Sequence, residues 1–312
     1  MKWHTRMTEL FKIKYPIMEG ALAGVADVNL AAAVSEAGGL GMLTGWTTRT
    51  PERLSKEIQK VRSMTDKPFA VNLSPTVDPQ LLDLLDVIIE EKVPIVETAG
   101  SRATEYGKRI KAAGLIWIHK IQTVRHALAA EQDGADAVTI MGLEGAGLKS
   151  PLILTTLVSI AMAAEKVKIP IIAAGGIGDA RTFLGALALG AEGVQLGSTL
   201  CAVKECQLAD HRKQVLVEAD PYDPKWREPI LTSPKVADLE KLKQAKGTKE
   251  IMMAAKDAED FGIPKEAGTG TISLAIGFIN EVITAKELID GIITGAEKIL
   301  TEKGIGGFKL EH

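Results

Sequence analysis

The sequence predicts an α/β protein, a (β/α)8 TIM barrel with a helical insertion, or lid, after strand 8. Short apolar runs that end in Gly or polar residues alternate with amphipathic helical stretches, one unit per ~25 residues. Eight such units are present in 312 residues. Continuous apolar strands alternating with helices are typical of a parallel sheet, and eight repeats favour its closure into a barrel. A doubly wound open sheet is the structural alternative.

Each predicted strand is short and is followed by a helix with hydrophobic residues at helical spacing. The predicted strands are Pro16–Glu19, Gly41–Thr44, Phe69–Leu73, Ile95–Thr98, Leu115–Lys120, Ala137–Met141, Ile171–Ala174 and Gly193–Leu196. The predicted helices are Val28–Ala37, Pro51–Ser63, Pro79–Glu91, Ala103–Ala113, Val124–Asp133, Leu152–Glu165, Ala180–Leu189 and Thr199–Glu205. Several end in a glycine that can cap a helix, as in Ala113-Gly114 and Leu189-Gly190.

The repeat pattern stops after the eighth unit. Residues 207–267 are rich in charge and proline, with helical stretches at Val236–Lys246 and Lys249–Phe261, and they predict an inserted lid or substrate domain. Apolar periodicity resumes at Thr271–Ile283 and Leu288–Leu300, so we expect these helices to pack back on the barrel. The predicted barrel therefore comprises residues 1–206 and 268–309, and 310–312 resemble a tag remnant.

Composition limits the classes of function. The formal net charge is −3 and basic residues are scattered, which argues against nucleic-acid binding. No signal peptide or membrane span is evident, so a cytoplasmic protein is expected. Cys201 and Cys206 are placed on one predicted helix, where side chains five positions apart point in different directions and do not pair. The histidines are dispersed, and no metal site is predicted.

Two glycine-rich stretches, Ala173–Asp179 and Gly193–Thr199, end the last two predicted strands. Glycine lets the backbone approach an anion, and a helix that follows directs its free N–H groups at it. In (β/α)8 barrels the loops after strands 7 and 8 often bind phosphate. Two tight turns without a ligand are the alternative, which we consider less probable because the stretches are neighbours.

Polar residues also end other predicted strands. Asn72 is an amide in an apolar strand, which is costly unless it is hydrogen-bonded. Lys120 ends the fifth strand, where an ammonium could stabilise the anionic edge of a reduced flavin, although a surface lysine is an equal alternative. His119, its neighbour, should point the opposite way into the core. The apolar residues expected to line a substrate pocket are Leu22, Trp46, Met141 and Leu148.

Together these segments resemble the nitronate monooxygenase (2-nitropropane dioxygenase) family, which includes flavin-type enoyl-ACP reductases. The likeness covers most of the barrel, from Tyr15–Gly20 through Asn29–Gly41, Asn72 and Lys120 to the two glycine-rich stretches. It implies FMN as cofactor and NADH or NADPH as reductant. By position it implies that FMN is held by Gly20, Ala21, Leu22, Asn72, Lys120, Gly147, Gly175, Gly176, Gly197, Ser198 and Thr199.

The chain departs from the family pattern at three positions. The loop that commonly reads Glu-Ala-Gly-Gly-His, with a His that acts on the substrate, is Glu144-Gly145-Ala146-Gly147-Leu148 here. Leu148 cannot transfer a proton, which calls the family's His route into question. The usual Gln residues before this loop and before the first Gly are Met141 and Glu19.

The leading hypothesis is an FMN-dependent oxidoreductase that passes hydride from NADH or NADPH through flavin to an apolar acceptor, such as an enoyl thioester or quinone. The second is nitronate monooxygenase activity with another base, for example Lys149. The third is a non-catalytic flavin-binding subunit of a complex. The expected partner is a small-molecule or thioester substrate, with neither nucleic acid nor membrane, and a homodimer is left open.

Overall fold

The computed structural model describes residues 2–48, 50–75, 81–147, 150, 152–232 and 272–303. Its centre is one sheet of eight parallel strands in the order β1-β8-β7-β6-β5-β4-β3-β2. The strands are β1 (Ile17–Glu19), β2 (Gly41–Thr44), β3 (Phe69–Leu73), β4 (Ile95–Ala99), β5 (Ile116–Ile121), β6 (Ala137–Met141), β7 (Ile171–Ala174) and β8 (Gly193–Leu196). All eight predicted strands are confirmed, with shifts of no more than one residue at an end.

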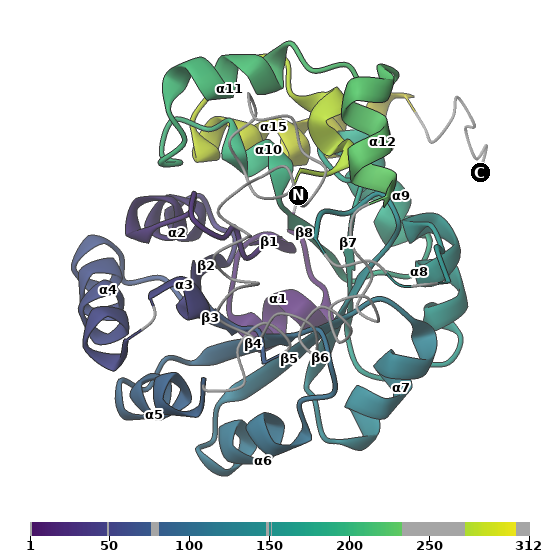
Figure 1. Cartoon of the computed structure of the whole chain (residues 1–312). Helices are drawn as coiled ribbons and strands as arrows, with labels where there is room; N and C mark the ends of the chain where they lie inside the picture. Colours follow the sequence, from purple (N-terminus) through teal and green to yellow (C-terminus); the bar gives the residue numbers. More distant parts are fainter. Residues whose placement is uncertain are drawn as a thin grey trace.

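Hydrogen bonds between β1 and Leu40 bring the two ends of the sheet together. Leu40 N–H donates to the carbonyl of Ile17 at 3.0 Å, and Glu19 N–H donates to the carbonyl of Leu40 at 2.9 Å. Glu19 Oε2 continues this seam by accepting the N–H of Met42 at 3.0 Å. The sheet is therefore a barrel, as predicted, and not an open sheet (Figure 1).

Helices surround the barrel in chain order (Figure 1). They are α2 (Val28–Glu36), α3 (Gly45–Thr48), α4 (Pro51–Met64), α5 (Leu82–Glu90), α6 (Thr104–Ala112), α7 (Val124–Gln132), α8 (Thr156–Ala164) and α9 (Ala180–Ala188). Side chains of Asp27, Thr50, Thr123, Thr155 and Asp179 cap five of them by accepting backbone N–H groups. Gly114 and Gly190 follow α6 and α9 with φ of 73° and 101°, as expected for the predicted capping glycines.

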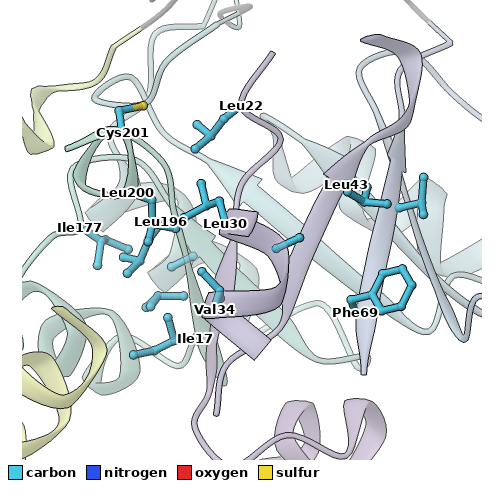
Figure 2. Packing of buried hydrophobic residues seen from close by; sticks show 14 of the residues in the cluster. Ile17, Leu22, Leu30, Val34, Leu43, Phe69, Ile177, Leu196, Leu200 and Cys201 are labelled. Carbon is cyan, nitrogen blue, oxygen red and sulfur yellow. The ribbon is translucent and has the colours of Figure 1, made fainter. Parts of the chain in front are cut away.

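The apolar core lies between the strands and the helices. Leu30 and Val34 of α2 meet Ile17 of β1 and Leu196 of β8 in this layer (Figure 2). Gly41 makes the close packing of α2 possible, since a Cβ there would lie 1.9 Å from the carbonyl oxygen of Ala31. The alternation of apolar strand and amphipathic helix in the sequence corresponds to this layer.

Three helix predictions require correction, and the short helix α3 was not predicted. The predicted helix Leu152–Glu165 begins only at Thr156, because Thr155 is its cap and Ile153 has a left-handed φ of 52°. The predicted helix Thr199–Glu205 is a single turn, α10 (Ser198–Cys201), so Cys206 lies beyond it. Both cysteines are buried and free. The stretch Thr271–Ile283 contains only a 3-10 helix, η3 (Leu274–Phe278), and α1 (Arg6–Phe11) was missed.

The predicted return of the chain to the barrel is confirmed for the last helix. α15 (Ala285–Lys298) packs against α9 and α2, and a short π-helix, η4 (Ile299–Lys303), follows it (Figure 1). α15 thus completes the ring of helices after β8. In the chain between β8 and α15, the helices α11 (Asp210–Val217) and α12 (Pro224–Thr232) belong to the predicted insertion. Residues 233–267 of that insertion lie outside the described residues. Residues 310–312 also lie outside them. No described helix has the length and apolar character needed to cross a membrane.

Candidate functional site

The inner face of the barrel changes from apolar to polar over two residues. Ala70, Ile95, Ile118 and Ala137 belong to an apolar cluster inside the barrel. Side chains two positions apart on a strand lie on the same face. The next inward residues toward the carboxyl ends are Asn72, Glu97, Lys120 and Thr139. We call these four residues, together with Gln195 of β8, the polar floor.

Glu97 is the centre of the polar floor and is fully buried. Its Oε2 accepts from Asn72 Nδ2 at 2.7 Å, and its Oε1 accepts from Gln195 Nε2 at 2.8 Å and Thr139 Oγ1 at 3.2 Å. Side chains of three other strands, β3, β6 and β8, therefore converge on the carboxylate of Glu97 in β4. The sequence prediction named Asn72 but missed Glu97 and Gln195. Gln195 is a polar residue between apolar neighbours, the same signal that pointed to Asn72, and Glu97 is a charged residue that follows two apolar ones in its strand.

Two acceptors of the polar floor have no partner. Asn72 Oδ1 and Gln195 Oε1 are buried and make no hydrogen bond within the described part of the chain. A buried polar atom without a partner costs ~1–3 kcal/mol. Unsatisfied acceptors at the carboxyl end of a barrel are therefore places where a ligand donor would be bound with a gain in free energy.

Lys120, on β5, belongs to the same floor and lies near Glu97. Burial lowers the pKa of Lys120, and the nearby Glu97 carboxylate partly opposes this by raising it. His119, the preceding residue, is buried on the other face, where its Nδ1 lies 2.8 Å from Thr98 Oγ1, and burial lowers the pKa of His119 to about 4. The prediction that the two side chains point in opposite directions agrees with these environments.

The backbone after β1 lies directly against the polar floor. Gly20 N–H donates to the Leu196 carbonyl at 2.7 Å, and Leu22 N–H donates to Thr44 Oγ1 at 3.1 Å. A Cβ at Gly20 would lie 3.1 Å from that carbonyl oxygen and 3.6 Å from Gln195 Cγ. Ala21 is half-buried and Leu22 is 9% exposed. The segment thus presents little more than backbone beside Gln195.

Glu19 occupies the position where the family commonly has Gln. Burial raises the pKa of Glu19 well above its usual value, while the hydrogen bond from Met42 opposes the shift. A neutral carboxyl has one donor and one acceptor and so resembles an amide in its hydrogen bonding. A protonated Glu19 would therefore offer the same kinds of hydrogen-bonding group as Gln.

The two glycine-rich turns lie side by side. β7 pairs with β8 through Ala174 and Gln195, and a Cβ at Gly178 would lie 2.8 Å from Thr199 Cγ2. Gly175 and Gly176 have φ of 101° and 70°, a region that glycine adopts without strain. Their backbone N–H groups have no acceptor among the residues that the structure describes.

Of the three residues predicted after β8, only Thr199 has an unpartnered side chain. Ser198 Oγ accepts from the N–H of Ser273 at 2.7 Å and so fastens the segment before η3 to the barrel. Thr199 Oγ1 is buried and without a partner in the described ranges. Gly197 precedes α10 with no side-chain cap, which leaves the first N–H groups of that turn without an intrahelical acceptor.

The loop after β6 is fastened to the barrel by Glu144. Its Oε2 accepts from Thr156 N–H at 2.8 Å and Thr156 Oγ1 at 2.9 Å. Met141 is buried under this loop, since a Cβ at Gly145 would lie 2.4 Å from Met141 Cγ. Gly147 has a φ of 85° and open space around its Cα. Leu148, Lys149 and the Trp46 side chain lie outside the described residues, so their predicted roles stay predictions.

These features fit a flat, phosphorylated ring system. At Gly20 the backbone lies so close to β8 that a side chain would crowd it, the polar floor offers unsatisfied acceptors and the Lys120 amine, and the adjacent glycine turns offer free N–H groups for a phosphate.

The chain is similar to proteins of known family. A family model described as nitronate monooxygenase matches residues 4–295. The chain is 36% identical over 211 residues to the (3aS,4S,5R,7aS)-5-hydroxy-7a-methyl-1-oxo-octahydro-1H-indene-4-carboxyl-CoA dehydrogenase of Rhodococcus jostii, covering 67% of this chain and 58% of the dehydrogenase. The chain thus spans less than two thirds of that relative.

Two further similarities cover a larger share of the matched protein. A probable nitronate monooxygenase of Staphylococcus saprophyticus is 30% identical over 268 residues, which are 72% of this chain and 75% of that protein. The solved structure of FabK from Thermotoga maritima superposes with a TM-score of 0.81 at 33% identity, over 95% of this chain and 97% of FabK. The chain belongs to the nitronate monooxygenase family, a family of enzymes.

Proposed function

We propose that this protein is an FMN-dependent oxidoreductase that passes hydride from NADH or NADPH to an apolar acceptor, with an enoyl thioester preferred over a quinone. The observation that carries the proposal is a pair of buried acceptors, Asn72 Oδ1 and Gln195 Oε1, which have no partner in the described part of the chain and lie in the polar floor that also contains Lys120. Oxidised isoalloxazine has a ring N–H flanked by carbonyl oxygens. The floor offers acceptors for the N–H and a cation for the oxygens.

Each part of the site has a separate task in this proposal. The bound flavin supplies the hydride chemistry. Gly20, Ala21 and Leu22 lie along the ring, and Lys120 stabilises negative charge at its polar edge. Gly147 approaches the sugar chain, and Gly175, Gly176, Gly197, Ser198 and Thr199 surround the phosphate. Ser198 contributes through its backbone, because its hydroxyl already accepts from Ser273.

Two relatives support a thioester as the class of substrate. The Rhodococcus protein and a similar one of Mycobacterium tuberculosis, 34% identical over 220 residues, are both named as dehydrogenases of a carboxyl-CoA, which is a thioester. Their named substrate also carries a fused hydrocarbon ring system with one hydroxyl and one oxo group. The similarities therefore favour a thioester over a quinone as the substrate class. A dehydrogenase removes hydrogen from its thioester, whereas the proposed reaction adds hydride to one, so the relatives support the class of substrate and not the direction of transfer.

The test begins with the cofactor. Purified protein should bind FMN, and anaerobic addition of NADH or NADPH should bleach its visible absorption, which an enoyl-CoA should restore. Lys120→Met should weaken FMN binding by about tenfold, the loss expected for a hydrogen bond from a charged donor. A colourless protein that refuses added FMN would contradict the proposal, as would a flavin spectrum unchanged by both nucleotides.

Nitronate oxidation is the second candidate, and the Staphylococcus relative supports it by name. Lys149 remains the proposed base. Oxygen uptake with propionate 3-nitronate should exceed that of a flavin-free blank and should fall in Lys149→Met. Absence of uptake would remove this candidate. The third hypothesis, a non-catalytic subunit, gains no support from membership of an enzyme family.

A further inference from the structure

The polar floor contains a charged residue to which no task has yet been assigned. Glu97 is fully buried inside the barrel, and its carboxylate accepts from Asn72, Gln195 and Thr139. None of these donors is charged. A buried carboxylate is costly unless hydrogen bonds compensate for its lost hydration, so its presence in a position where a Leu or Val would suit the strand calls for a functional reason.

The consequence of Glu97 is the orientation of two amides. Both oxygens of Glu97 accept hydrogen bonds, and each amide presents its NH2 group to one of them. The NH2 group and the oxygen are on opposite arms of a planar amide. Asn72 Oδ1 and Gln195 Oε1 are therefore turned away from Glu97, and both are left without a protein donor in the described part of the chain.

Gln195 lies where the proposed ring would bind. Its Nε2 also lies 3.4 Å from the carbonyl oxygen of Glu19, and its Cγ and Cδ would be 3.6 and 3.7 Å from a Cβ at Gly20. The amide is thus immediately beside the Gly20 backbone, along which the proposed ring would lie. Asn72 is linked to the same carboxylate from β3, on the other side of Glu97 along the sheet order.

We propose that Glu97 is a positioning residue: it holds the amides of Asn72 and Gln195 with their oxygens free, so that the site selects a ring that carries an N–H donor. The inference rests on the proposed function for the identity of the ring, but the amide orientation itself does not require a flavin. With neutral Gln at position 97, one arm would donate instead of accept. At least one of the two amides would then turn over and present NH2 to the ligand.

The experiment compares FMN with 3-methyl-FMN, in which the only N–H of the oxidised ring is replaced by N–CH3. The native protein should bind FMN more tightly than the methylated analogue by at least about tenfold, the value of one buried hydrogen bond. In Glu97→Gln this preference should fall by about tenfold, while the steric effect of the methyl group stays the same. A merely structural role of Glu97 would weaken both ligands equally and leave the ratio unchanged, which would overturn the inference.

The matched control is Glu91→Gln. Glu91 also accepts from three side chains, Ser55, Gln59 and Arg62, but it lies in the outer helical layer at the end of α5. In Glu91→Gln the ratio of the affinities for FMN and 3-methyl-FMN should equal that of the native protein. A shift as large as that of Glu97→Gln would show that the ratio reports on stability and not on the amides.

A second measurement keeps the inference separate from the proposed function and from any folding defect of the variant. In native protein without flavin, NMR should show the side-chain NH2 protons of Asn72 and Gln195 protected from exchange, since they face Glu97. Added FMN should shift their side-chain carbonyl carbons and leave those protons protected. Rapid exchange of the NH2 protons before FMN is added would contradict the inference. If the protons are protected but FMN does not bind, the proposed function fails and the positioning role stands.

Discussion

The two ends of the barrel interior share the same strands and yet have opposite character. Toward the amino ends of the strands, Met18, Met42 and Ile118 meet Met7 and Phe11 of α1 in a cluster without polar side chains. α1 crosses the centre of the barrel in Figure 1 and seals this end. Toward the carboxyl ends, two residues further along, the interior consists of the polar floor with its unsatisfied acceptors.

The difference separates stability from binding. The backbone ladder is continuous along both halves, so the side chains alone decide what each half does. Apolar burial at the sealed end stabilises the fold by ~25 cal/mol per Å2 removed from water. Unpartnered acceptors at the open end reduce stability in the absence of a ligand, as is common where a site is preorganised. Substitutions at the two ends should therefore affect different measurements.

The largest effect is expected at the sealed end. Phe11→Ala removes a side chain that is 1% exposed and leaves a cavity under the barrel. The free energy of unfolding should fall by about 3–5 kcal/mol, as for other buried Phe residues. Urea denaturation measures this, with Tyr222→Ala, whose side chain is 84% exposed, as a control of little effect. An unchanged stability, or a loss of FMN affinity in the folded fraction of Phe11→Ala, would contradict the assignment of stability to this end of the barrel and of binding to the other.

A smaller effect is expected on the outer face of β5, where the His119 side chain faces the helices. Because burial holds the pKa of His119 near 4 against 6.5 for an ordinary histidine, the native state stays neutral while the unfolded state takes up a proton. Stability should therefore fall by roughly 3 kcal/mol as the pH falls from 6.5 to 4. His119→Gln should reduce this slope in pH-dependent denaturation. An identical slope in the variant would show that other groups cause it.

The smallest effect is expected at the rim of the open end. Thr156→Val removes the hydroxyl that links Glu144 to the carbonyls of Ala174 and Gly175. Loss of these hydrogen bonds should cost about 1–2 kcal/mol of stability and increase cleavage of the loop after β6 in limited proteolysis. Thr301→Val, at an exposed position near the chain's last described residues, serves as control. Cleavage equal to that of the native protein would show that Glu144 does not hold this loop.

Most of the barrel was predictable because strand and helix periodicity are local properties. Elements whose existence depends on packing were not. α1 has six residues and depends on the Thr5 cap and on burial of Met7 and Phe11 against the strands. The stretch after Ser198 has the composition of a helix but is a single turn, because the chain leaves the barrel there and α15 completes the ring instead.

In the site, single polar residues could be recognised but their connections could not. Asn72 and Lys120 were identified from their strand positions, whereas Glu97 and Gln195 are distant in sequence and meet only when the sheet closes. Hydrogen bonds between residues 98 positions apart leave no local pattern. Alternation and glycine placement in the sequence alone determined the barrel and the two adjacent turns. Only the tertiary structure decided which buried polar atoms found partners, because barrel closure sets the distances among side chains of different strands.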